Sequence, residues 1–168
     1  LSAAVAPAVD AGASPEASTT ANEEPLPEVP STIKQEVTVV AEHKKPRRLL
    51  RLLASLHAEA ANGGDRRILI FANRIKTVDF VMDILLRHRF SALALSSQLS
   101  SHERQAALSN LQSGRVRIIV ATDVAARGID IPRLGTVINW DAGTNLTQYA
   151  HRVGRTGRQG ATGSAYTF

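Results

Sequence analysis

The chain has 168 residues, no cysteine and a formal charge of +5, a length that suits one domain of common size plus a tail. The absence of cysteine excludes disulfides, thiolate metal sites and cysteine nucleophiles, and it suits a reducing intracellular compartment. Apolar stretches reach only about five residues, far short of the roughly 20 that cross a bilayer, so no membrane partner is predicted. Because the sequence starts at Leu1 and stops at Phe168 inside a strand pattern, we expect a piece of a longer protein with a slightly truncated C-terminal domain.

Charge divides the sequence into two parts. Residues 1–31 are rich in Ala, Pro and Ser and contain five acidic residues but no basic one, a composition that buries too little apolar area to offset chain entropy. We therefore predict that 1–31 is a disordered acidic linker or insertion between domains. Residues 32–168 hold 20 basic and 10 acidic residues, a formal charge of +10, which favours a polyanionic partner such as nucleic acid or a nucleotide. A well-solvated basic surface explains the surplus equally well.

The globular part is expected to begin with a strand at the β-branched run 37–40. Pro46 then opens a helix with a wide stripe of leucines, and residues 62–65 (Asn-Gly-Gly-Asp) end it. Further along, helical patterns run from Ile75 to Leu85, from the capping box of Ser100 and Glu103 to Gly114, and onward from a start near 145–149. Short apolar runs between them predict strands at 68–71, 92–95, 116–120, 136–139 and 164–168.

Strands that are apolar throughout and separated by helices indicate an α/β fold in which a parallel sheet is covered on both faces. In such sheets the ligand loops follow the carboxyl ends of the strands. The most distinctive residues of this sequence also follow strand patterns, so we expect them to share one edge of the sheet.

One such loop is the run ATDVAARGIDIP at 121–132. It combines a hydroxyl group, two carboxylates, an arginine and a glycine, the groups needed to hold a phosphate on one side and a ribose on the other. An ordinary connection between a strand and a helix accounts for the same residues equally well.

The run HRVGRTGRQG at 151–160 is more distinctive. The spacing of Arg152, Arg155 and Arg158 predicts that the three stack on one side of a helical turn, while Gly154 and Gly157 leave room for a bulky ligand. Three unpaired guanidinium groups repel one another, which suits contact with a triphosphate better than stabilisation of a fold. The plain alternative is a solvated basic helix end.

Together, ATDVAARGIDIP, VINWD at 137–141 and HRVGRTGRQG resemble the C-terminal, second RecA-like domain of the DEAD-box RNA helicases, and the resemblance covers 33–168. It implies a RecA-like domain over 32–168 that closes on an N-terminal RecA-like domain. The pair would bind RNA, hydrolyse ATP in an RNA-stimulated reaction and unwind duplexes locally.

The resemblance also implies roles on the ATP side. Arg155 and Arg158 are expected to be arginine fingers that bind ATP and stabilise the transferring phosphoryl group. His151 and Arg152 are expected to join the catalytic machinery by tying it to the acidic motif of the first domain. The remaining expected ATP contacts are Gly128, which lines the nucleotide site, and Asp130, which contacts the ribose.

On the RNA side the resemblance implies phosphate contacts by Arg104 and Thr122. Arg74 stands where the family often has an RNA-contacting threonine, and we predict that it contacts the strand. Phe71 falls in the motif that braces the arginine segment, although plain core packing is as good an explanation.

The RNA side also departs from the family. Ser96-Ser97-Gln98 stands where His-Gly-Asp is usual, and Ser101 replaces a glutamine. These departures keep an alternative open, in which the chain is a non-catalytic RecA-like module that binds RNA or protein.

The sequence contains neither a Gly-rich loop ending in Gly-Lys-Thr or Gly-Lys-Ser nor an Asp-Glu-Ala-Asp motif, the elements that cradle phosphates and hold Mg²⁺. We therefore expect the N-terminal domain to hold Mg²⁺ and most of the ATP, and the chain alone to be inactive. The expected partners are RNA, that domain and protein cofactors. The expected location is intracellular, in the nucleus, nucleolus or cytoplasm, with another organelle left open.

Overall fold

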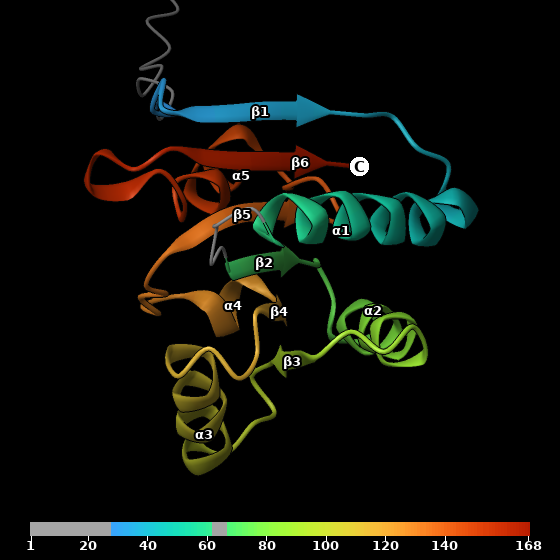
Figure 1. Cartoon of the computed structure of the whole chain (residues 1–168), viewed down its shortest axis with the longest axis vertical. Helices are drawn as coiled ribbons and strands as arrows, with labels where there is room; N and C mark the ends of the chain where they lie inside the picture. Colours follow the sequence, from blue (N-terminus) through green and yellow to red (C-terminus); the bar gives the residue numbers. More distant parts are fainter. Residues whose placement is uncertain (1–27, 62–66) are drawn as a thin grey trace, which may run out of the picture.

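The computed structural model describes residues 28–61 and 67–168, which form one six-stranded sheet with helices on both faces (Figure 1). All strand pairs are parallel, and the strand order is β1-β6-β5-β2-β4-β3. The strands are β1 (Ile33–Val37), β2 (Arg67–Phe71), β3 (Ala92–Leu95), β4 (Ile118–Ala121), β5 (Leu134–Asn139) and β6 (Gly163–Thr167). The α/β parallel sheet expected from the sequence is confirmed.

Two layers of helices cover this sheet. The helices are α1 (Lys45–Ala61), α2 (Ile75–Arg87), α3 (Ser101–Gln112), α4 (Asp123–Ala126) and α5 (Leu146–Val153), with short 3-10 helices at Glu42–Lys44 and Arg158–Gly160. One core cluster joins α1 and α2 to one face of the sheet, and a second joins α3 and α4 to the other. Within β2, Ile68 and Ile70 belong to the first cluster, whereas Leu69 and Phe71 belong to the second. Because successive strand residues point to opposite faces, both faces are packed.

The caps of α3 formed as the sequence predicts. The Ser100 side chain accepts a hydrogen bond from the backbone of Glu103 (3.2 Å), and the Glu103 carboxylate accepts one from the backbone of Ser100 (2.9 Å). Gly114 follows the helix with a φ of 73°, a left-handed conformation that glycine adopts without steric cost. Helices α2 and α5 and strands β2 and β3 also lie where the periodicity placed them.

Several strand boundaries differ from the predictions, among them the start of β5 at Leu134 rather than Thr136, and two of the differences have a clear cause. The first strand is β1 at Ile33–Val37 rather than 37–40, because its partner β6 ends at Thr167, where Thr38 makes the last backbone hydrogen bond (2.8 Å). Strand β4 begins at Ile118 rather than Val116, since the Val116 amide is held by Asn110 at the end of α3 (3.2 Å). The end of β1 is thus set by its pairing with β6, and the start of β4 by a hydrogen bond to α3, rather than by the strand preference of their own side chains.

Some expectations fall on residues outside the described part. Residues 1–27 of the predicted disordered segment 1–31 lie outside the described part, and so does the predicted helix end at 62–65. Among the described helices none combines the length and apolar character that a membrane span requires.

Parallel strands bring their carboxyl ends to one edge of the sheet. The chain leaves β2 through Asn73, β4 through Thr122 and β5 through Asp141. Three polar side chains from distant parts of the sequence therefore meet at this carboxyl edge.

Candidate functional site

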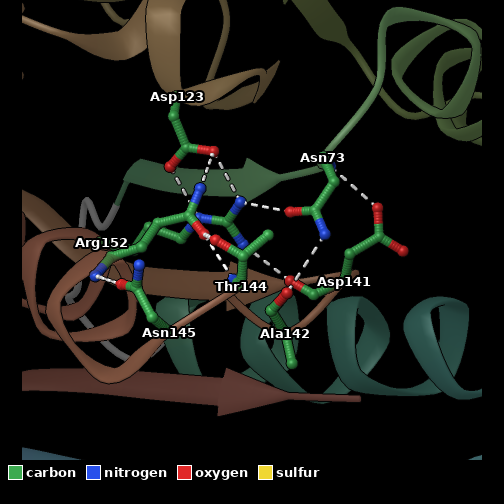
Figure 2. A network of polar contacts seen from close by, with 8 residues as sticks. Asn73, Asp123, Asp141, Ala142, Thr144, Asn145 and Arg152 are labelled. Atoms are coloured by element: carbon green, nitrogen blue, oxygen red, sulfur yellow. Dashed lines mark hydrogen bonds and ion pairs between the residues drawn. The ribbon is translucent and has the colours of Figure 1, made fainter.

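One buried arginine organises the carboxyl edge. Arg152, near the end of α5, is 1% exposed, and its guanidinium reaches the segments that follow β2, β4 and β5 (Figure 2). Its Nε and Nη2 donate to the two carboxylate oxygens of Asp123 (2.7 and 2.6 Å), and Nη2 also donates to Asn73 Oδ1 (2.5 Å). Nη1 donates to the backbone oxygen of Asp141 (2.7 Å). A bidentate pair of this kind fixes both distance and orientation.

The aromatic ring of Phe71 also contacts the Arg152 guanidinium. Its ring is 2% exposed and belongs to the core, and the Arg152 Cζ lies 5.2 Å from the ring centroid. At this distance an aromatic face attracts a cation. Phe71 is thus a core residue, as one interpretation expects, and it also contacts an arginine of the 151–160 segment.

The Asp123 carboxylate is held in its charged form. Burial raises its pKa, but the hydrogen bonds and positive charge of Arg152, with a further hydrogen bond from Gln148, outweigh this effect. The net result is a pKa below the ordinary aspartate value. The pair thus contributes to stability while Asp123 is ionised.

The start of α5 is tied into this network. Asn145 caps the helix by accepting from the Gln148 backbone (2.8 Å), and the Gln148 side chain donates to Asp123 (2.8 Å). The Gln148 side-chain oxygen accepts from the backbone and hydroxyl of Thr144 (2.5 and 2.9 Å). Figure 2 shows Thr144 and Asn145 beside Arg152. Because Gln148 and Arg152 both donate to Asp123, both ends of α5 are anchored to the same carboxylate.

Asp141 completes the network from β5. Its carboxylate accepts from the Asn73 backbone (2.8 Å), while the Asn73 side chain donates to the backbone of Ala142 (3.2 Å). Lys45, itself 6% exposed, donates to the backbone of Trp140 (3.0 Å) and lies 3.8 Å from the Asp141 carboxylate. The start of α1 is thereby joined to the same edge.

The expected stack of three unpaired arginines is wrong. Helix α5 ends at Val153, Arg152 is buried and paired, and Arg155 and Arg158 lie beyond the helix. The physical reason is the backbone, because Gly154 is the C-cap and Gly157 has a φ of 67°, which turns the chain off the helical path.

The expected role of Gly157 in making room for a ligand is also not what the structure shows. A Cβ on Gly157 would lie 2.5 Å from Ile33 Cγ1. The missing side chain therefore lets the arginine segment pack against β1. On Gly154, a Cβ would meet the backbone oxygen of Ala150 at 3.1 Å, which is contact within α5 itself.

Arg155 differs from Arg152 in having few partners. Among the described residues its guanidinium makes one long hydrogen bond, to the Ile129 oxygen (3.5 Å), and no ion pair. Burial lowers the pKa of Arg155, and the charges of Arg158 and Arg127 lower it further, against the opposing charge of Asp123. A half-buried cation with cationic neighbours is well placed to receive an anion.

Arg158 is exposed and lies near the carboxylate of Asp130, and both residues are expected from the sequence to contact ATP. Its Nη1 is 3.6 Å from Asp130 Oδ1, and the Asp130 side chain is 84% exposed. Gly128, two residues earlier, is exposed with a φ of 72° and open space beside it. The structure thus brings the expected phosphate and ribose residues to one surface.

Two adjoining hollows lie over this surface. The larger, of about 560 Å³, is lined by residues of the carboxyl edge that include Phe71, Asp123, Arg127, His151, Arg152 and Arg155. The smaller, of about 370 Å³, is lined by Arg127, Ala150, His151, Gly154, Arg155 and Arg158. Exposed His151 and half-buried Arg155 line both.

The three expected RNA contacts lie around the same edge. Arg104 donates from α3 to the Ala125 oxygen of α4 (2.6 Å), and Thr122 is the N-cap residue of α4 with 8% exposure. Arg74 is the exposed N-cap residue of α2, directly after Asn73. Arg104 and Thr122 therefore both lie at α4, whereas Arg74 lies at the start of α2.

No individual role is assigned from the sequence to Asn73, Asp123 and Asp141, which bind Arg152, or to Gln148, which binds Asp123. Asn73 and Asp141 each follow a strand closely, and Asp123 and Gln148 lie in the first turns of α4 and α5. Their position just after buried strands indicates that these polar residues lie at the carboxyl edge. Their spacing in the sequence does not indicate which of them form hydrogen bonds with one another.

Residues 44–160 match the family described as the helicase conserved C-terminal domain. The chain is 43% identical over 135 residues to the ATP-dependent RNA helicase DBP3 of Candida albicans, covering 80% of this chain and 24% of that protein. It is 39% identical over 142 residues to the pre-mRNA-splicing ATP-dependent RNA helicase PRP28 of Cryptococcus neoformans, covering 84% of this chain and 18% of that protein.

Solved structures agree in fold. Dbp5 of S. cerevisiae bound to RNA and ADP BeF3 is similar with a TM-score of 0.74 and 28% identity, covering 83% of this chain and 36% of that one. The RNA helicase Prp28 of Chaetomium thermophilum bound to ADP gives a TM-score of 0.72 and 32% identity, covering 83% and 33%. The chain thus spans about a quarter or less of the length of the two curated relatives.

Replacing Arg152 should destabilise the fold far more than replacing Arg158. Arg152→Met removes the charged partner of Asp123 and the donor to Asn73 Oδ1. Losing one member of a fully buried pair typically costs about 3–5 kcal/mol, and because Asp123 is 32% exposed we expect a loss at or below the lower end of this range. Arg158→Gln, on an exposed side chain, should change the free energy of unfolding by about 0.5 kcal/mol or less. Urea unfolding measures both, and equal losses would contradict the central position of Arg152.

Stability should also depend on pH through Asp123. Because its folded-state pKa is lowered, its contribution is present above the unfolded value of about 3.9 and is lost as pH falls through the folded pKa. The difference in unfolding free energy between the native chain and Asp123→Asn should therefore be largest near neutral pH and shrink below about pH 4. Denaturant titrations at several pH values test this, and a constant difference down to the lowest pH would refute it.

Proposed function

The chain belongs to the helicase conserved C-terminal domain family, as the second RecA-like domain of a DEAD-box RNA helicase, and from this premise we propose that it is the arginine-bearing half of a composite ATPase. In this function it closes on an N-terminal RecA-like domain, binds RNA and supplies arginine fingers for RNA-stimulated ATP hydrolysis. Local unwinding of RNA duplexes is the expected outcome of the whole protein.

The carrying observation is the difference between Arg152 and the two arginines that follow it. Arg152 is buried and makes four hydrogen bonds within the chain. Arg155 lines both hollows and forms no ion pair with the described residues, whereas Arg158 is exposed, donates to the Gly154 oxygen (3.1 Å) and lies 3.6 Å from Asp130. A cation that is positioned by the fold but not neutralised can stabilise negative charge that develops on a bound ligand.

ATP would supply the phosphoryl group whose charge these arginines meet. Arg155 and Arg158 would contact the phosphates, Asp130 the ribose, and Gly128 would let the backbone approach. The 3.6 Å contact between Arg158 and Asp130 supports this assignment, because it shows that the two side chains reach one small region. Mg²⁺ and the remaining phosphate contacts are assigned to the N-terminal domain.

The catalytic role expected for Arg152 becomes one of positioning. Its hydrogen bonds fix α5, and through it the turn that carries Arg155 and Arg158. His151 is its exposed neighbour at the rim of both hollows. We therefore assign the contact with the acidic motif of the first domain to His151, with Arg152 holding the helix in place.

RNA would run across the ends of β2 and β4. Arg104 and Thr122 both lie at α4, and exposed Arg74 opens α2. Arginine contacts to a phosphate backbone track a strand without reading its sequence. Dbp5, a structural relative, was solved with RNA and ADP BeF3, which supports the same pair of ligands here.

A non-catalytic module that binds RNA or protein is the second candidate. Ser97 and Ser101, at positions where the family differs, are exposed near the start of α3, and this observation favours weaker RNA contact. Both candidate functions predict that the chain binds RNA or protein, but only the ATPase function requires Arg155 and Arg158. Protein cofactors and an intracellular location, nuclear or cytoplasmic, belong to either proposal.

In the full-length protein, Arg155→Ala and Arg158→Ala should each lower RNA-stimulated kcat by about 10³-fold or more. RNA affinity should stay nearly unchanged, because neither side chain is assigned to the RNA surface. Steady-state ATP hydrolysis and RNA binding titrations measure the two effects.

Arg51→Ala is the matched control, since Arg51 is an exposed arginine on α1 that lines neither hollow. It should leave kcat unchanged. Full turnover in both finger variants would refute the ATPase assignment and favour the binding module.

A further inference from the structure

A second concentration of positive charge lies at the opposite edge of the sheet. The ends of α1, α2 and α3 and the starts of β2, β3 and β4 enclose a hollow of about 550 Å³. Apolar side chains line part of it, among them Leu56 and Phe90. Its basic lining residues are His57, His88, Arg89, Arg115 and Arg117.

A smaller hollow of about 260 Å³ adjoins the first at Gly114 and adds Arg67 and Arg133. None of the described residues that line either hollow is acidic. We call the exposed basic residues of the two hollows the basic amino edge: His57, His88, Arg89, Arg115, Arg117 and Arg133.

The backbone at this edge is also unusual. Among the described residues, the non-glycine residues with positive φ are Arg89 (60°) and Arg133 (55°), and both belong to the basic amino edge. Arg89 follows the C-cap of α2, where the amide of Phe90 bonds back to Leu85 (2.9 Å). Glycine is the usual residue in this position. Local backbone preference therefore does not explain an arginine here, and such outliers cluster at sites that bind something.

We propose that the acidic segment, residues 1–27 of the same chain, docks on the basic amino edge. This segment carries Asp10, Glu16, Glu23 and Glu24 and no basic residue. Its charge is therefore opposite to that of a surface whose described lining residues include no carboxylate.

The connection between the two supports docking within one chain. Strand β1 begins at Ile33 and runs parallel to the other strands, so the chain enters the sheet at the same edge as the hollows. Val29 packs against the small core cluster of Ile33 and Val153, which fixes the point of attachment.

The acidic segment is long enough to extend from β1 to the basic amino edge. Strand β4 is four strand positions from β1, a separation of about 19 Å at roughly 4.8 Å per strand. A chain of 27 residues can extend to about 90 Å, so the segment covers this distance without being stretched. Tethering also gives a high effective concentration, which favours a weak electrostatic contact.

The carboxyl edge is a poorer target for the same segment. It contains Asp123, Asp130 and Asp141 beside its arginines, and it lies a strand length away from the point of entry, about 17 Å for five residues. The segment is thus expected to cover the amino edge and leave the proposed ATP and RNA surface free.

The absence of cysteine permits a direct test on the chain 1–168. Ser18→Cys, between Glu16 and Glu23, would carry a single nitroxide spin label, and amide resonances would report where the label approaches. We expect paramagnetic broadening at Arg89, Ser91 and Arg115 but not at Arg74 or Val124. The broadening should disappear near 1 M salt, where the screening length is about 3 Å.

Charge variants identify the interaction. Glu16→Gln, Glu23→Gln and Glu24→Gln combined should abolish the broadening at the basic amino edge. Broadening centred on the carboxyl edge, broadening that survives neutralisation, or no localised broadening would each overturn the proposal.

Arg89→Gly tests the surface itself without straining the fold. Glycine suits the positive φ of this position, so the unfolding temperature should be unchanged or higher while the broadening weakens. Arg115→Gln should act in the same direction. Arg51→Gln, at an exposed position outside both hollows, should leave the broadening intact, and equal broadening in all three variants would refute the role of the basic amino edge.

Discussion

The bond between the Arg152 guanidinium and the Asp123 carboxylate is the interaction on which the carboxyl edge depends. A buried charge is costly unless it is paired and hydrogen-bonded. Arg152 meets this demand with Asp123, Asn73 and the backbone of Asp141. Since these partners follow β4, β2 and β5, satisfying one guanidinium requires three strand ends and α5 to be in register.

This requirement links stability to function. Helix α5 ends one residue after Arg152, and Gly154 and Gly157 turn the chain so that Arg155 and Arg158 reach the surface hollows. The close fit of Gly157 against Ile33 secures that turn on β1. A fully paired arginine thus fixes the position of two at the surface. Of these, Arg155 forms no ion pair with the described residues, and electrostatic stabilisation needs such preorganised charge. The two edges of the sheet also differ in charge. Asp123 and Asp130 pair with Arg152 and Arg158 at the carboxyl edge, whereas the described lining of the amino edge includes no acidic residue.

Much of the fold could be predicted from the sequence because its signals are local. The apolar runs of β2 and β3, the period of α2 and the capping box of α3 each depend on residues close in the chain. Boundaries set by partners could not be predicted in this way. The end of β1 depends on where β6 stops, and the start of β4 depends on a bond to Asn110.

In the candidate site too, local motifs could be recognised from the sequence, whereas contacts between distant residues could not. Motif resemblance identified Arg155, Arg158, Gly128 and Asp130, and the structure brings Arg158 close to Asp130. The arginine spacing of three suggested equivalent side chains, but burial separates Arg152 from the others. Its partner Asn73 lies 79 positions away in sequence, a distance over which no local pattern carries information.

The proposed function requires that this chain provide positioned arginines but not a complete ATPase. Steady-state ATP hydrolysis by residues 1–168 alone, compared with the full-length protein in the presence and absence of RNA, tests it most directly. We expect no turnover above background for residues 1–168 and RNA-stimulated turnover for the full-length protein. Measurable ATP hydrolysis by residues 1–168 alone would contradict the proposed function.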